Sequence, residues 1–438
     1  MADRVLVVGL ARSGRAAALL LAGLGHDVVA IDAAPVDAPE LTAAGIDVRA
    51  PFDGAVPGVA LVVKSPGVPA SAAPVAAARA AGTPVMSEIE LAVRHLANPL
   101  IGVTGTNGKT TTTELAAHLL RTAGIDAVAC GNQGTPLSAL VGAVDAGAWL
   151  VVECSSFQLE DIDTFHPRAA VLLNITPDHL DRHASLEEYR DAKLRIFENQ
   201  VAQDLAIVPR GLVPTGGAPA RHVDEGPAGP GAVAWSEGGL HHAGLGLVAS
   251  WEDVSLRGRH NRQNAMAAVA LAAHAGATRD ALAAGLAAFP GVEHRLEVVA
   301  DVGGVRYVND SKATNPDAAL AALDAYPERV HLIAGGRAKG TPFDGLAAAA
   351  AGVVVRAYFV GDAAGEIGAA FDARGIAAEQ CGTIPAAVAA AAGRARPGDV
   401  VLLAPACTSF DQYANFEERG RDFRDAVAHL PGSRFPRR

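Results

Sequence analysis

The sequence predicts a three-domain α/β protein in which each domain is built on a parallel sheet. Short apolar runs, the pattern of buried strands, alternate with Ala- and Leu-rich stretches that favour helices. This alternation starts again near Pro99 and once more near Phe289. A chain of 438 residues is also too long for a single hydrophobic core. We therefore expect domains at 1–94, 95–292 and 293–438.

The first domain is expected to be Rossmann-like. Apolar strand candidates at 3–9 and 28–32 enclose the turn GLARSG (9–14) and a helix, and Asp32 ends the second strand. This arrangement is typical of dinucleotide-binding folds, in which the helix N-terminus holds a pyrophosphate and the acid binds a ribose. The turn KSPGV (64–68) follows a third strand at the same sheet edge. The pattern leaves two ligands open, an NAD-type dinucleotide or a nucleotide-sugar.

The central domain is expected to be an α/β domain of the P-loop ATPase type. A strand in LIGVTG (100–105) leads through a glycine-containing loop into a helix over 110–124. Further strands are expected within 148–156 and 169–176, and a long helix over 264–276.

The third domain is again expected to be Rossmann-like. Strand-like runs at 330–336, 356–362 and 399–407 each end in small or polar residues. In open α/β sheets, ligands bind at the carboxyl edge of such strands. We therefore expect a second ligand-binding edge in this domain.

The composition argues against several classes of protein. A net charge of −11 does not supply the basic face that a generic nucleic-acid binder needs. No apolar stretch reaches the ~20 residues of a membrane span. The apolar segment 15–25 lies between two strands, which favours a helix over a signal peptide. The four cysteines are widely spaced, as in a reduced protein. We expect a cytoplasmic monomer that binds small molecules and no nucleic acid.

The loop GVTGTNGKTTT resembles a phosphate-binding loop but departs from the pattern G-x-x-x-x-G-K-[ST]. The first glycine of that pattern would fall on Val103, whereas the glycine that opens this loop, Gly105, comes two positions later. Gly105 and Gly108 allow backbone N–H groups to converge on phosphate oxygens. Lys109 adds a positive charge for the β- and γ-phosphates, and Thr110 adds a hydroxyl suited to Mg²⁺. The loop therefore predicts binding of a nucleotide phosphate chain.

Two further features are expected beside this loop. Glu153 ends an apolar strand, where P-loop enzymes place a carboxylate for Mg²⁺. His179 follows Asp178 at another strand end and is a candidate contact for Mg²⁺ or substrate. The i, i+4 spacing of His179 and His183 invites a zinc site, but no cysteine, third ligand or H-E-x-x-H motif accompanies it. We therefore prefer magnesium to zinc.

Lys193 occupies an unusual place in a predicted helix. Ser185 and Glu188 form a capping box that starts this helix. Its apolar face includes Tyr189 and Ile196, and Lys193 falls on the same face. A lysine is almost never buried without a partner, because removing its ammonium group from water is costly. Lys193 either extends to solvent or an acid, or it faces the phosphate and metal site.

Taken with these residues, the sequence resembles the Mur ligase family. The motifs that carry the resemblance run along nearly the whole chain. They are GLARSG, SPGV, GVTGTNGKTTT, GNQGTPL, ECSSFQLE, TPDHLDRH, YRDAKLRIFENQ, GRHNRQNAMAA, HRLEVV, NDSKATNPDAAL, GGRAKG and APACTSFDQYANFEERGRDF. The TGTNGKT form of the loop is shared by a wider superfamily that includes the folylpolyglutamate synthases. NDSKATN and SFDQYANFEERG are more specific for the member that adds D-glutamate.

The resemblance implies an ATP-dependent amide ligase of peptidoglycan precursor synthesis, and hence a role in cell wall biogenesis, cell shape and cell division. ATP would phosphorylate the carboxylate of UDP-N-acetylmuramoyl-L-alanine (UDP-MurNAc-L-Ala), and the amine of D-glutamate would then attack the acyl phosphate. The resemblance also implies two Mg²⁺ ions and a carbamylated Lys193. A carbamate is an anion whose hard oxygen atoms suit Mg²⁺.

The resemblance further implies roles for individual residues. The catalytic residues would be Lys109, His179 and Lys193. The metal ligands would be Thr110, Glu153, His179 and Lys193. The ATP contacts would be Gly105, Thr106, Asn107, Gly108, Lys109, Thr110, Thr111, Asn264, Arg295 and Asp310. The UDP part would contact Ser13, Asp32, Ser65 and Gly67, and the muramoyl-alanine part would contact Asn132 and His179. The D-glutamate site would contain Thr314, Lys339, Ser409 and Phe416, with Lys312 counted among the substrate-binding residues.

The first domain departs from the family pattern at two places. After the second strand the family has a DTR-like stretch, whereas this chain has Ala33 and Ala34 after Asp32. The polar side chains that contact the uracil side are therefore missing. The turn GLARSG carries Ala11 and Arg12 where a glycine and an apolar residue are common, and Arg12 is a candidate for the diphosphate.

Several alternatives remain beside the D-glutamate ligase. One is a sibling ligase that adds L-alanine or a diamino acid, although no DNPR-type motif occurs. A folylpolyglutamate synthase would not need the Rossmann-like first domain. A nucleotide-sugar-binding regulator with an inactive ATP site is disfavoured because Lys109, Thr110 and Glu153 are intact. An NAD dehydrogenase is disfavoured because the motifs cluster outside the first domain.

Overall fold

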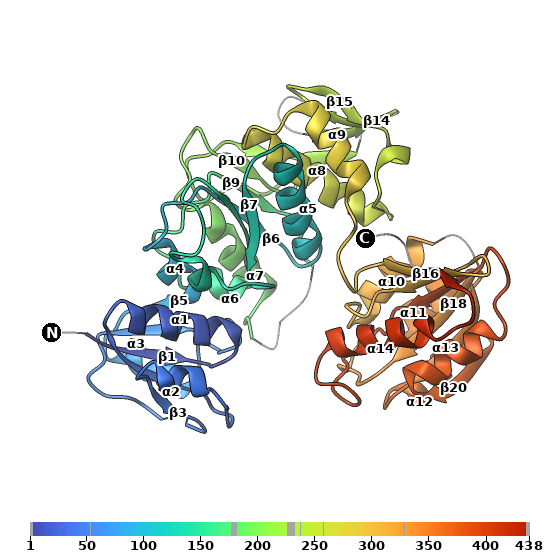
Figure 1. Cartoon of the computed structure of the whole chain (residues 1–438), viewed down its shortest axis with the longest axis horizontal. Coiled ribbons are helices and arrows are strands. Elements are labelled where there is room, and N and C mark those ends of the chain that lie inside the picture. The colour runs from blue at the N-terminus through green and yellow to red at the C-terminus, as the bar shows by residue number, and fades with distance from the viewer. Residues whose placement is uncertain are drawn as a thin grey trace. The chain divides into compact units, whose positions relative to one another are not determined.

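The computed structural model describes residues 3–52, 54–176, 182–225, 233–236, 238–256, 258–326 and 329–434. The chain divides into two compact units. Unit 1 comprises the chain up to Val254 together with Gln263–Phe289, and unit 2 comprises Ser255–Arg262 and the chain from Pro290 onward. Both units contain helices packed on a mainly parallel sheet (Figure 1). The predicted α/β class is therefore confirmed.

The N-terminal part of unit 1 is a five-stranded parallel sheet in the order β3-β2-β1-β4-β5. Its strands are β1 Arg4–Val8, β2 Asp27–Ile31, β3 Asp47–Arg49, β4 Leu61–Lys64 and β5 Val85–Ser87. Its helices are α1 Arg12–Gly23, α2 Pro39–Ala43, α3 Ala73–Ala80 and α4 Glu88–Val93. Leu21 of α1 and Leu41 of α2 pack on one face with Val7, whereas Val75 of α3 packs on the other with Val8. Alternate residues of one strand thus serve two core clusters.

The central part of unit 1 is a six-stranded sheet in the order β11-β10-β9-β6-β8-β7, and all its pairings are parallel. Its strands are β6 Leu100–Thr104, β7 Ala127–Gly131, β8 Trp149–Glu153, β9 Ala169–Leu172, β10 Leu205–Ile207 and β11 Ala220–Arg221. The associated helices are α5 Lys109–Thr122, η1 Leu137–Leu140, α6 Ser156–Leu159, α7 Leu186–Leu194, η2 Arg195–Phe197, α9 Arg279–Ala288 and α8 Arg259–His274, of which the part from Gln263 onward belongs to unit 1. Strand β6 lies between β9 and β8, so the loop after β6 begins at the middle of the sheet's carboxyl edge.

A small four-stranded sheet follows β11 along the chain. It consists of β12 Val223–Glu225, β13 Val233–Ser236, β14 Gly239–His242 and β15 Gly246–Ala249, followed by η3 Trp251–Asp253. The sequence indicates only surface loops or a short β section over 209–232, and it does not predict these strands one by one because they lack a long apolar run.

Polar contacts hold the two larger sheets of unit 1 together. The ammonium of Lys64 at the end of β4 is buried and lies 2.9 Å from a carboxylate oxygen of Asp161. The Ser87 N–H donates to the Asp161 carbonyl at 2.9 Å. The carboxylate of Glu90 in α4 accepts bonds from the backbone N–H groups of Asp163 and Thr164. These contacts join the five-stranded sheet and the six-stranded sheet within unit 1.

Unit 2 is built on a seven-stranded sheet in the order β20-β19-β18-β21-β17-β16-β22. Its strands are β16 Glu297–Val302, β17 Val305–Asn309, β18 Val330–Gly335, β19 Val354–Val360, β20 Ala378–Gly382, β21 Val400–Leu403 and β22 Ser433–Arg434. Its helices are α10 Pro316–Asp324, α11 Asp344–Ala350, α12 Ala364–Asp372, α13 Ile384–Ala392 and α14 Phe416–Ala428. Helices α10, α11 and α12 contribute to one core cluster, and α13 and α14 contribute to the other. The pairings of β16 are antiparallel and the others are parallel.

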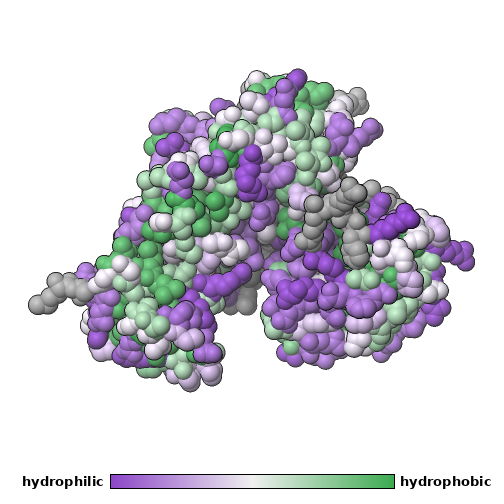
Figure 2. Space-filling view, in the orientation of Figure 1, coloured by the Kyte–Doolittle hydropathy of each residue, from purple (hydrophilic) through white to green (hydrophobic). Residues whose placement is uncertain are grey.

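Helix α14 is amphipathic, with its buried residues on one face. Its buried residues, Arg419, Gly420, Phe423 and Val427, recur at helical spacing. The face of unit 2 over α14 that Figure 2 shows is mainly hydrophilic. In the described part of the chain, no helix is both long and apolar enough to cross a membrane.

Candidate functional site

The phosphate-type loop connects β6 to α5 and contains two glycines in left-handed or related conformations. Gly105 has φ +150° and Gly108 has φ +87°. A Cβ on Gly108 would lie 2.2 Å from Oδ1 of Asn264, so only glycine fits there. Gly108 is also the N-cap of α5, and no side chain caps this helix. The N-terminus of α5 is therefore open to an external anion, as the loop motif predicts.

The segment after β9 holds the loop in shape. The Thr106 hydroxyl bonds to Thr176 and to the Tyr189 hydroxyl. The Asn107 N–H donates to Oδ1 of Asn174 at 2.9 Å, and the Asn174 amide donates back to the Asn107 carbonyl at 3.0 Å. Thr106 and Asn107, both predicted to contact ATP, thus have a visible structural role. Asn174 was not singled out from the sequence, because a lone asparagine after a strand carries no distinct signal.

Two lysines meet at one carbonyl oxygen of the loop. Nζ of Lys109 donates to the carbonyls of Gly105 at 2.9 Å and Thr106 at 2.8 Å. Nζ of Lys193 donates to the same Gly105 carbonyl at 3.0 Å. The two nitrogens are therefore within about 6 Å of each other, a distance at which like charges repel noticeably in a partly buried site. An anion between or beside these groups would relieve the repulsion.

Lys193 is buried, so of the alternatives left open by the sequence its ammonium does not extend to solvent. Only 1% of the residue is exposed, and its ammonium lies 4.5 Å from the ring centroid of Tyr189. The predicted helix start is also confirmed. The Ser185 hydroxyl accepts from the Glu188 N–H at 3.1 Å, and the Glu188 carboxylate accepts from the Ala184 N–H at 2.8 Å. The cap fixes α7 so that Lys193, two turns later, reaches the phosphate loop.

Glu153 ends β8 next to β6 and has the features of a metal ligand. It is 2% exposed, and its Oε1 accepts a bond from the Asn132 side-chain amide at 3.0 Å. Among the described residues, its buried Oε2 has no hydrogen-bond partner. A buried carboxylate oxygen without a donor fits a hard cation such as Mg²⁺. Thr110, whose hydroxyl is the other predicted ligand in this loop, begins α5 directly after Lys109.

His179, predicted as a catalytic and metal-binding residue, lies outside the described residues, as does Asp178. His183 is described and packs into the protein interior. Its Nε2 lies 3.0 Å from the Ser156 hydroxyl, and its ring stacks on Phe157 at a centroid distance of 5.2 Å. Desolvation lowers the pKa of His183, although the nearby Glu160 opposes this effect. No group of three metal-ligating side chains occurs within the described residues.

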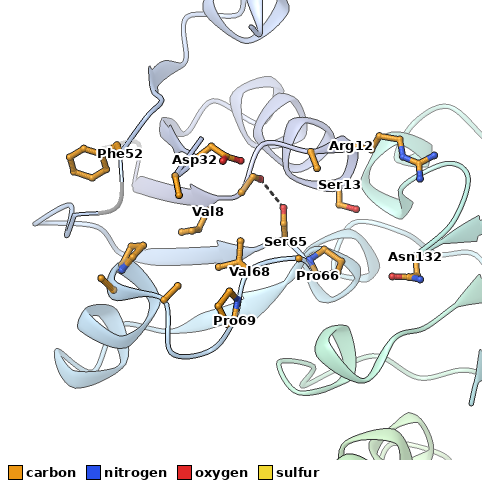
Figure 3. Close-up of a pocket in the computed structure, with 17 residues that line it drawn as sticks. Val8, Arg12, Ser13, Asp32, Phe52, Ser65, Pro66, Val68, Pro69 and Asn132 are labelled. Atoms are coloured by element: carbon orange, nitrogen blue, oxygen red, sulfur yellow. Dashed lines mark hydrogen bonds between the residues drawn. The ribbon is translucent and has the colours of Figure 1, made fainter. Parts of the chain in front are cut away.

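A pocket of about 590 Å³ opens at the carboxyl edge of the first sheet. The residues that line it, several of which appear in Figure 3, include the predicted contacts Ser13, Asp32, Ser65, Gly67 and Asn132. Asn132 follows β7 of the central sheet and also bonds to Glu153. One residue therefore joins the wall of this pocket to the candidate metal site.

Two tight turns form the floor of the pocket. The Ser65 hydroxyl donates to the Gly9 carbonyl at 2.8 Å and so ties the turn after β4 to the turn after β1. A Cβ on Gly14 would lie 1.7 Å from the Gly9 carbonyl, which explains the spacing of the two glycines. The Asp32 carboxylate accepts from the Leu10 N–H at 2.6 Å and from the Ala34 N–H at 2.9 Å. Ser65 and Asp32 therefore shape the pocket as well as lining it.

In unit 2 the predicted substrate residues come from three neighbouring parallel strands. Lys312 and Thr314 follow β17, Lys339 follows β18, and Ser409 follows β21. Because β18, β21 and β17 are adjacent, these loops share one edge of the sheet. The Lys312 ammonium lies 3.8 Å from the ring centroid of Phe416, the first residue of α14. Ser409 is buried, whereas Lys339 is exposed.

Arg419 links the same three loops and was not singled out from the sequence. It is 1% exposed. Its guanidinium donates to the Ser311 carbonyl and hydroxyl after β17 at 2.9 and 3.0 Å, and to the Cys407 and Thr408 carbonyls after β21, both at 3.1 Å. It also donates to the carbonyl of Gly335, the last residue of β18, at 3.4 Å. The signal that could have found it is the one that identified Lys193, a cation on the apolar face of a helix.

The predicted ATP contacts Arg295 and Asp310 lie in a strained part of unit 2. His294 has φ +62° and Leu296 has φ +45°, both unusual for residues with a Cβ. Asp310 holds this segment, because its Oδ1 accepts from the Leu296 N–H at 3.2 Å. Burial raises the pKa of Asp310 to about 7, and the charge of Arg295 opposes that shift.

The structure thus brings many predicted residues together within each unit. In unit 1, Lys193 bonds to Gly105 of the loop and Asn264 lies beside Gly108 of the same loop. Asn132 and Glu153 form a hydrogen-bonded pair. Thr111 lies buried in the first turn of α5. In unit 2 Arg295 and Asp310 are neighbours, and Lys312 contacts Phe416.

Comparison with known proteins gives matches along the chain. A family model described as the Mur ligase middle domain matches residues 103–272, and one described as the Mur ligase glutamate ligase domain matches residues 294–407. The UDP-N-acetylmuramoylalanine–D-glutamate ligase of Myxococcus xanthus is 44% identical over 98% of this chain and 98% of that protein. The enzyme of the same name from Pelotomaculum thermopropionicum is 42% identical with the same coverage of both chains.

A solved structure shows the same fold at lower identity. The UDP-N-acetylmuramate–alanine ligase of Thermotoga maritima aligns over 97% of this chain and 98% of its own, with a TM-score of 0.61 and 20% identity. At this identity the likeness concerns the fold, which agrees with the three-domain α/β architecture predicted from the sequence. The two family models and the nearly full-length relatives decide the assignment. The chain belongs to the Mur ligase family.

Proposed function

We propose that this chain is the ATP-dependent ligase that joins D-glutamate to UDP-MurNAc-L-Ala in peptidoglycan precursor synthesis. One observation carries the proposal beyond family membership. Asn132 lines the pocket at the edge of the first sheet and donates to Glu153 beside the phosphate loop. A nucleotide-sugar in that pocket would therefore extend its far end toward the place where ATP phosphates bind. The names of relatives with 42–44% identity support the same substrates.

The proposed reaction has two steps that the residues can support. The substrate carboxylate attacks the γ-phosphorus of ATP, so that ADP leaves and an acyl phosphate forms. The amine of D-glutamate then attacks the acyl carbon, and an amide forms as phosphate and a proton leave. Catalysis of such transfers rests mainly on positioning and on charge neutralisation. We assign Lys109, at the start of α5, to neutralising the β- and γ-phosphates.

Magnesium would supply Lewis-acid charge neutralisation at the transferred phosphoryl group. We assign its binding to Thr110 and Glu153 for one ion, and to His179 and Lys193 for a second. The partnerless Oε2 of Glu153 supports the first assignment. We further propose that Asn132 and His179 contact the muramoyl-alanine part, and that Ser13, Asp32, Ser65 and Gly67 contact the UDP part.

Other predicted contacts belong to the nucleotide and the amino acid. We assign Asn264, Arg295 and Asp310 to ATP. We assign Lys312, Thr314, Lys339, Ser409 and Phe416 to the substrate side in unit 2. The exposed Lys339 suits the carboxylates of D-glutamate, because an acidic amino acid needs a cation.

We propose that Lys193 is carbamylated. Its uncharged amine would add to CO₂, forming an N–C bond and releasing one proton to solvent, which leaves an anionic carbamate. The two lysine nitrogens at the Gly105 carbonyl support this modification, because an anion at Lys193 turns repulsion from Lys109 into attraction. The carbamate oxygens would also suit Mg²⁺.

The proposed reaction sets expectations for organisation. Residues 1–94 would bind the UDP part, 95–292 would bind ATP, and 293–438 would bind the amino acid. All assigned residues come from one chain, so a monomer suffices. ATP and a UDP-sugar are cytoplasmic metabolites, and the four cysteines are free, so we propose a cytoplasmic enzyme.

Phosphate release with ATP, Mg²⁺ and UDP-MurNAc-L-Ala tests the proposal across D-glutamate, L-glutamate, L-alanine and a diamino acid. We expect release with D-glutamate and little with the others. Glu153→Gln should stop the release, whereas Glu187→Gln, a change at an exposed acid of α7, should leave it intact. Release with another amino acid but not with D-glutamate would contradict the assignment.

A further inference from the structure

The pocket at the edge of the first sheet has two chemically different ends. Figure 3 shows Arg12, Ser13 and Asn132 at one end and Phe52 at the other. The first end contains the N-terminus of α1, a helix of 12 residues whose N-cap, Ala11, has no capping side-chain hydrogen bond. A helix N-terminus with an adjacent arginine favours an anion. The polar end therefore suits the diphosphate of a nucleotide-sugar.

Phe52 is the only Phe, Tyr or Trp within residues 1–94. Its N–H donates to the Asp32 carbonyl at 2.7 Å, which fixes its backbone beside the end of β2. Its side chain packs on the core cluster that contains Val8 and Val56, yet it remains only half-buried and lines the pocket. An aromatic ring that packs on the core and also lines the pocket provides a flat apolar surface for a ligand.

The residues that line this end of the pocket offer a base few side-chain hydrogen bonds. Arg49, whose guanidinium lies 6.0 Å from the centroid of the Phe52 ring, pairs with Asp47 and does not line the pocket. Ala33 and Ala34 have no polar side-chain atoms, and both oxygens of Asp32 already accept backbone hydrogen bonds. A pyrimidine ring at this end of the pocket would therefore meet an apolar wall. Stacking on an aromatic side chain is a common way to bind a base without hydrogen bonds to its edge.

We propose that Phe52 is the base-binding residue of this pocket and that the uracil ring of the UDP substrate stacks on it. This inference rests on the proposed function, because it takes UDP as the nucleotide. The order of the pocket supports the direction. Asn132 bonds to Glu153, so the sugar is expected at the end of the pocket near the candidate metal site. The diphosphate is expected at the N-terminus of α1. The base then occupies the end at Phe52.

Substitutions at Phe52 give a first test. Stacking contributes equally before and during the chemical step, so its loss should raise KM for UDP-MurNAc-L-Ala and leave kcat nearly unchanged. We expect Phe52→Leu to raise KM and the Kd of UDP by roughly tenfold or more. Phe52→Tyr, which keeps the ring, should restore most of the affinity. Val59→Ala removes a side chain from the same core cluster outside the pocket lining and should change neither constant.

A change in the ligand separates stacking from simple packing. 5,6-Dihydro-UDP keeps the diphosphate and the imide edge of the base but loses the flat aromatic ring. The parent protein should bind it several-fold more weakly than UDP, whereas Phe52→Leu should bind both nearly equally. Because the parent protein makes this comparison by itself, it remains decisive if a variant folds poorly. The unfolding midpoint and the Kd of ATP show whether the variants keep their fold.

The outcomes distinguish the two proposals. If the parent binds UDP and uses D-glutamate, but Phe52→Leu leaves KM unchanged or the parent does not discriminate against dihydro-UDP, the role of Phe52 is wrong and the ligase function stands. If the parent binds UDP with these Phe52 effects but does not use D-glutamate, the ligase assignment is wrong and the base site stands. If the parent fails to bind UDP, both are wrong.

Discussion

Two buried cations, Lys193 in unit 1 and Arg419 in unit 2, arise from the same sequence pattern and end in different environments. Each lies on the apolar face of a helix and is 1% exposed. Arg419 donates to four carbonyls and a hydroxyl at 2.9–3.4 Å, from the end of β18 and from the loops after β17 and β21. Lys193 donates to the carbonyl of Gly105, which Lys109 also uses.

The difference teaches how the chemistry of a buried cation decides its use. A guanidinium is planar, stays charged and offers five donors, so carbonyls can satisfy it without a carboxylate. Burial lowers the pKa of Arg419 to about 10, which still leaves it protonated at neutral pH. A lysine amine changes its protonation state more readily when buried and then becomes nucleophilic. Arg419 is thus a structural clamp, whereas Lys193 is suited to modification.

The largest expected effect comes from Lys193→Ala. Loss of the proposed carbamate should remove a metal ligand and lower kcat on the order of 1000-fold. Acetate or formate, added at high concentration, should restore part of the activity because it can replace the missing carboxylate oxygens. Phosphate release with and without these anions is the measurement.

Arg419→Ala is the matched control for this rescue. Its lost group is a cation, so carboxylates should not restore it. Full activity of unrescued Lys193→Ala, or equal rescue of both variants by acetate, would contradict the contrast between the two sites.

A second prediction compares stability when each cation is replaced by methionine. Arg419→Met leaves several buried carbonyls without donors, so we expect the free energy of unfolding to fall by about 3 kcal/mol or more. Lys193→Met removes the hydrogen bond to the Gly105 carbonyl and, in the carbamylated protein, an attraction to Lys109, so we expect a smaller fall of about 1 kcal/mol. Urea unfolding of both variants measures this difference.

The contrast fails if Lys193→Met is destabilised as much as Arg419→Met. The enzymatic activity of Lys193→Met provides a separate measurement. This variant should stay folded and still be inactive. A variant that is stable and inactive separates function from folding at this position.

The fold and much of the site were predictable because they depend on local patterns. Glycine turns after apolar strands predicted where β1 and β6 end, and the capping residues Ser185 and Glu188 predicted the start of α7. Helical spacing placed Lys193 on the apolar face of α7 but left open whether its ammonium extends to solvent or faces the loop. These features depend on residues close together in the sequence.

Other features depend on contacts between distant segments. The bond between Asn132 and Glu153 joins residues 21 apart, and the pair of Asn107 and Asn174 joins residues 67 apart. Phe52 lines the pocket because a loop after β3 returns to the end of β2, and no motif marks that return. The three-residue strands β3 and β10 were also missed, because brief runs carry a weak periodic signal. Strand β7 was missed because its sequence, AVACG, consists mostly of small residues.

A third kind of buried charge, in α4, extends the comparison to acids. Glu88 and Glu90 are both fully buried, two residues apart. Burial raises the pKa of Glu88 to about 7, and a backbone bond from Ser138 opposes the shift only in part. Burial also acts on Glu90, but bonds from the Asp163 N–H, Arg94 and Thr164 outweigh it, and the pKa of Glu90 is lowered. Burial therefore favours the protonated form of Glu88, whereas the hydrogen bonds that Glu90 accepts favour its charged form.

The smallest expected effect is a pH dependence of stability that differs in sign between these two residues. Between pH 4.5 and 7 the folded state holds a proton on Glu88 that the unfolded state has lost, so stability falls as pH rises, by about 2 kcal/mol. Glu88→Gln should remove this slope. Glu90 instead stabilises the fold at neutral pH and loses this contribution as pH falls through its lowered pKa. Glu90→Gln should therefore be less stable than the parent at pH 7, with a gap that closes in acid. Urea unfolding from pH 4 to 8 measures the free energy of unfolding of both variants. If Glu88→Gln and Glu90→Gln gave parallel curves, burial alone, and not the hydrogen-bond donors around each carboxylate, would determine how these two acids affect stability.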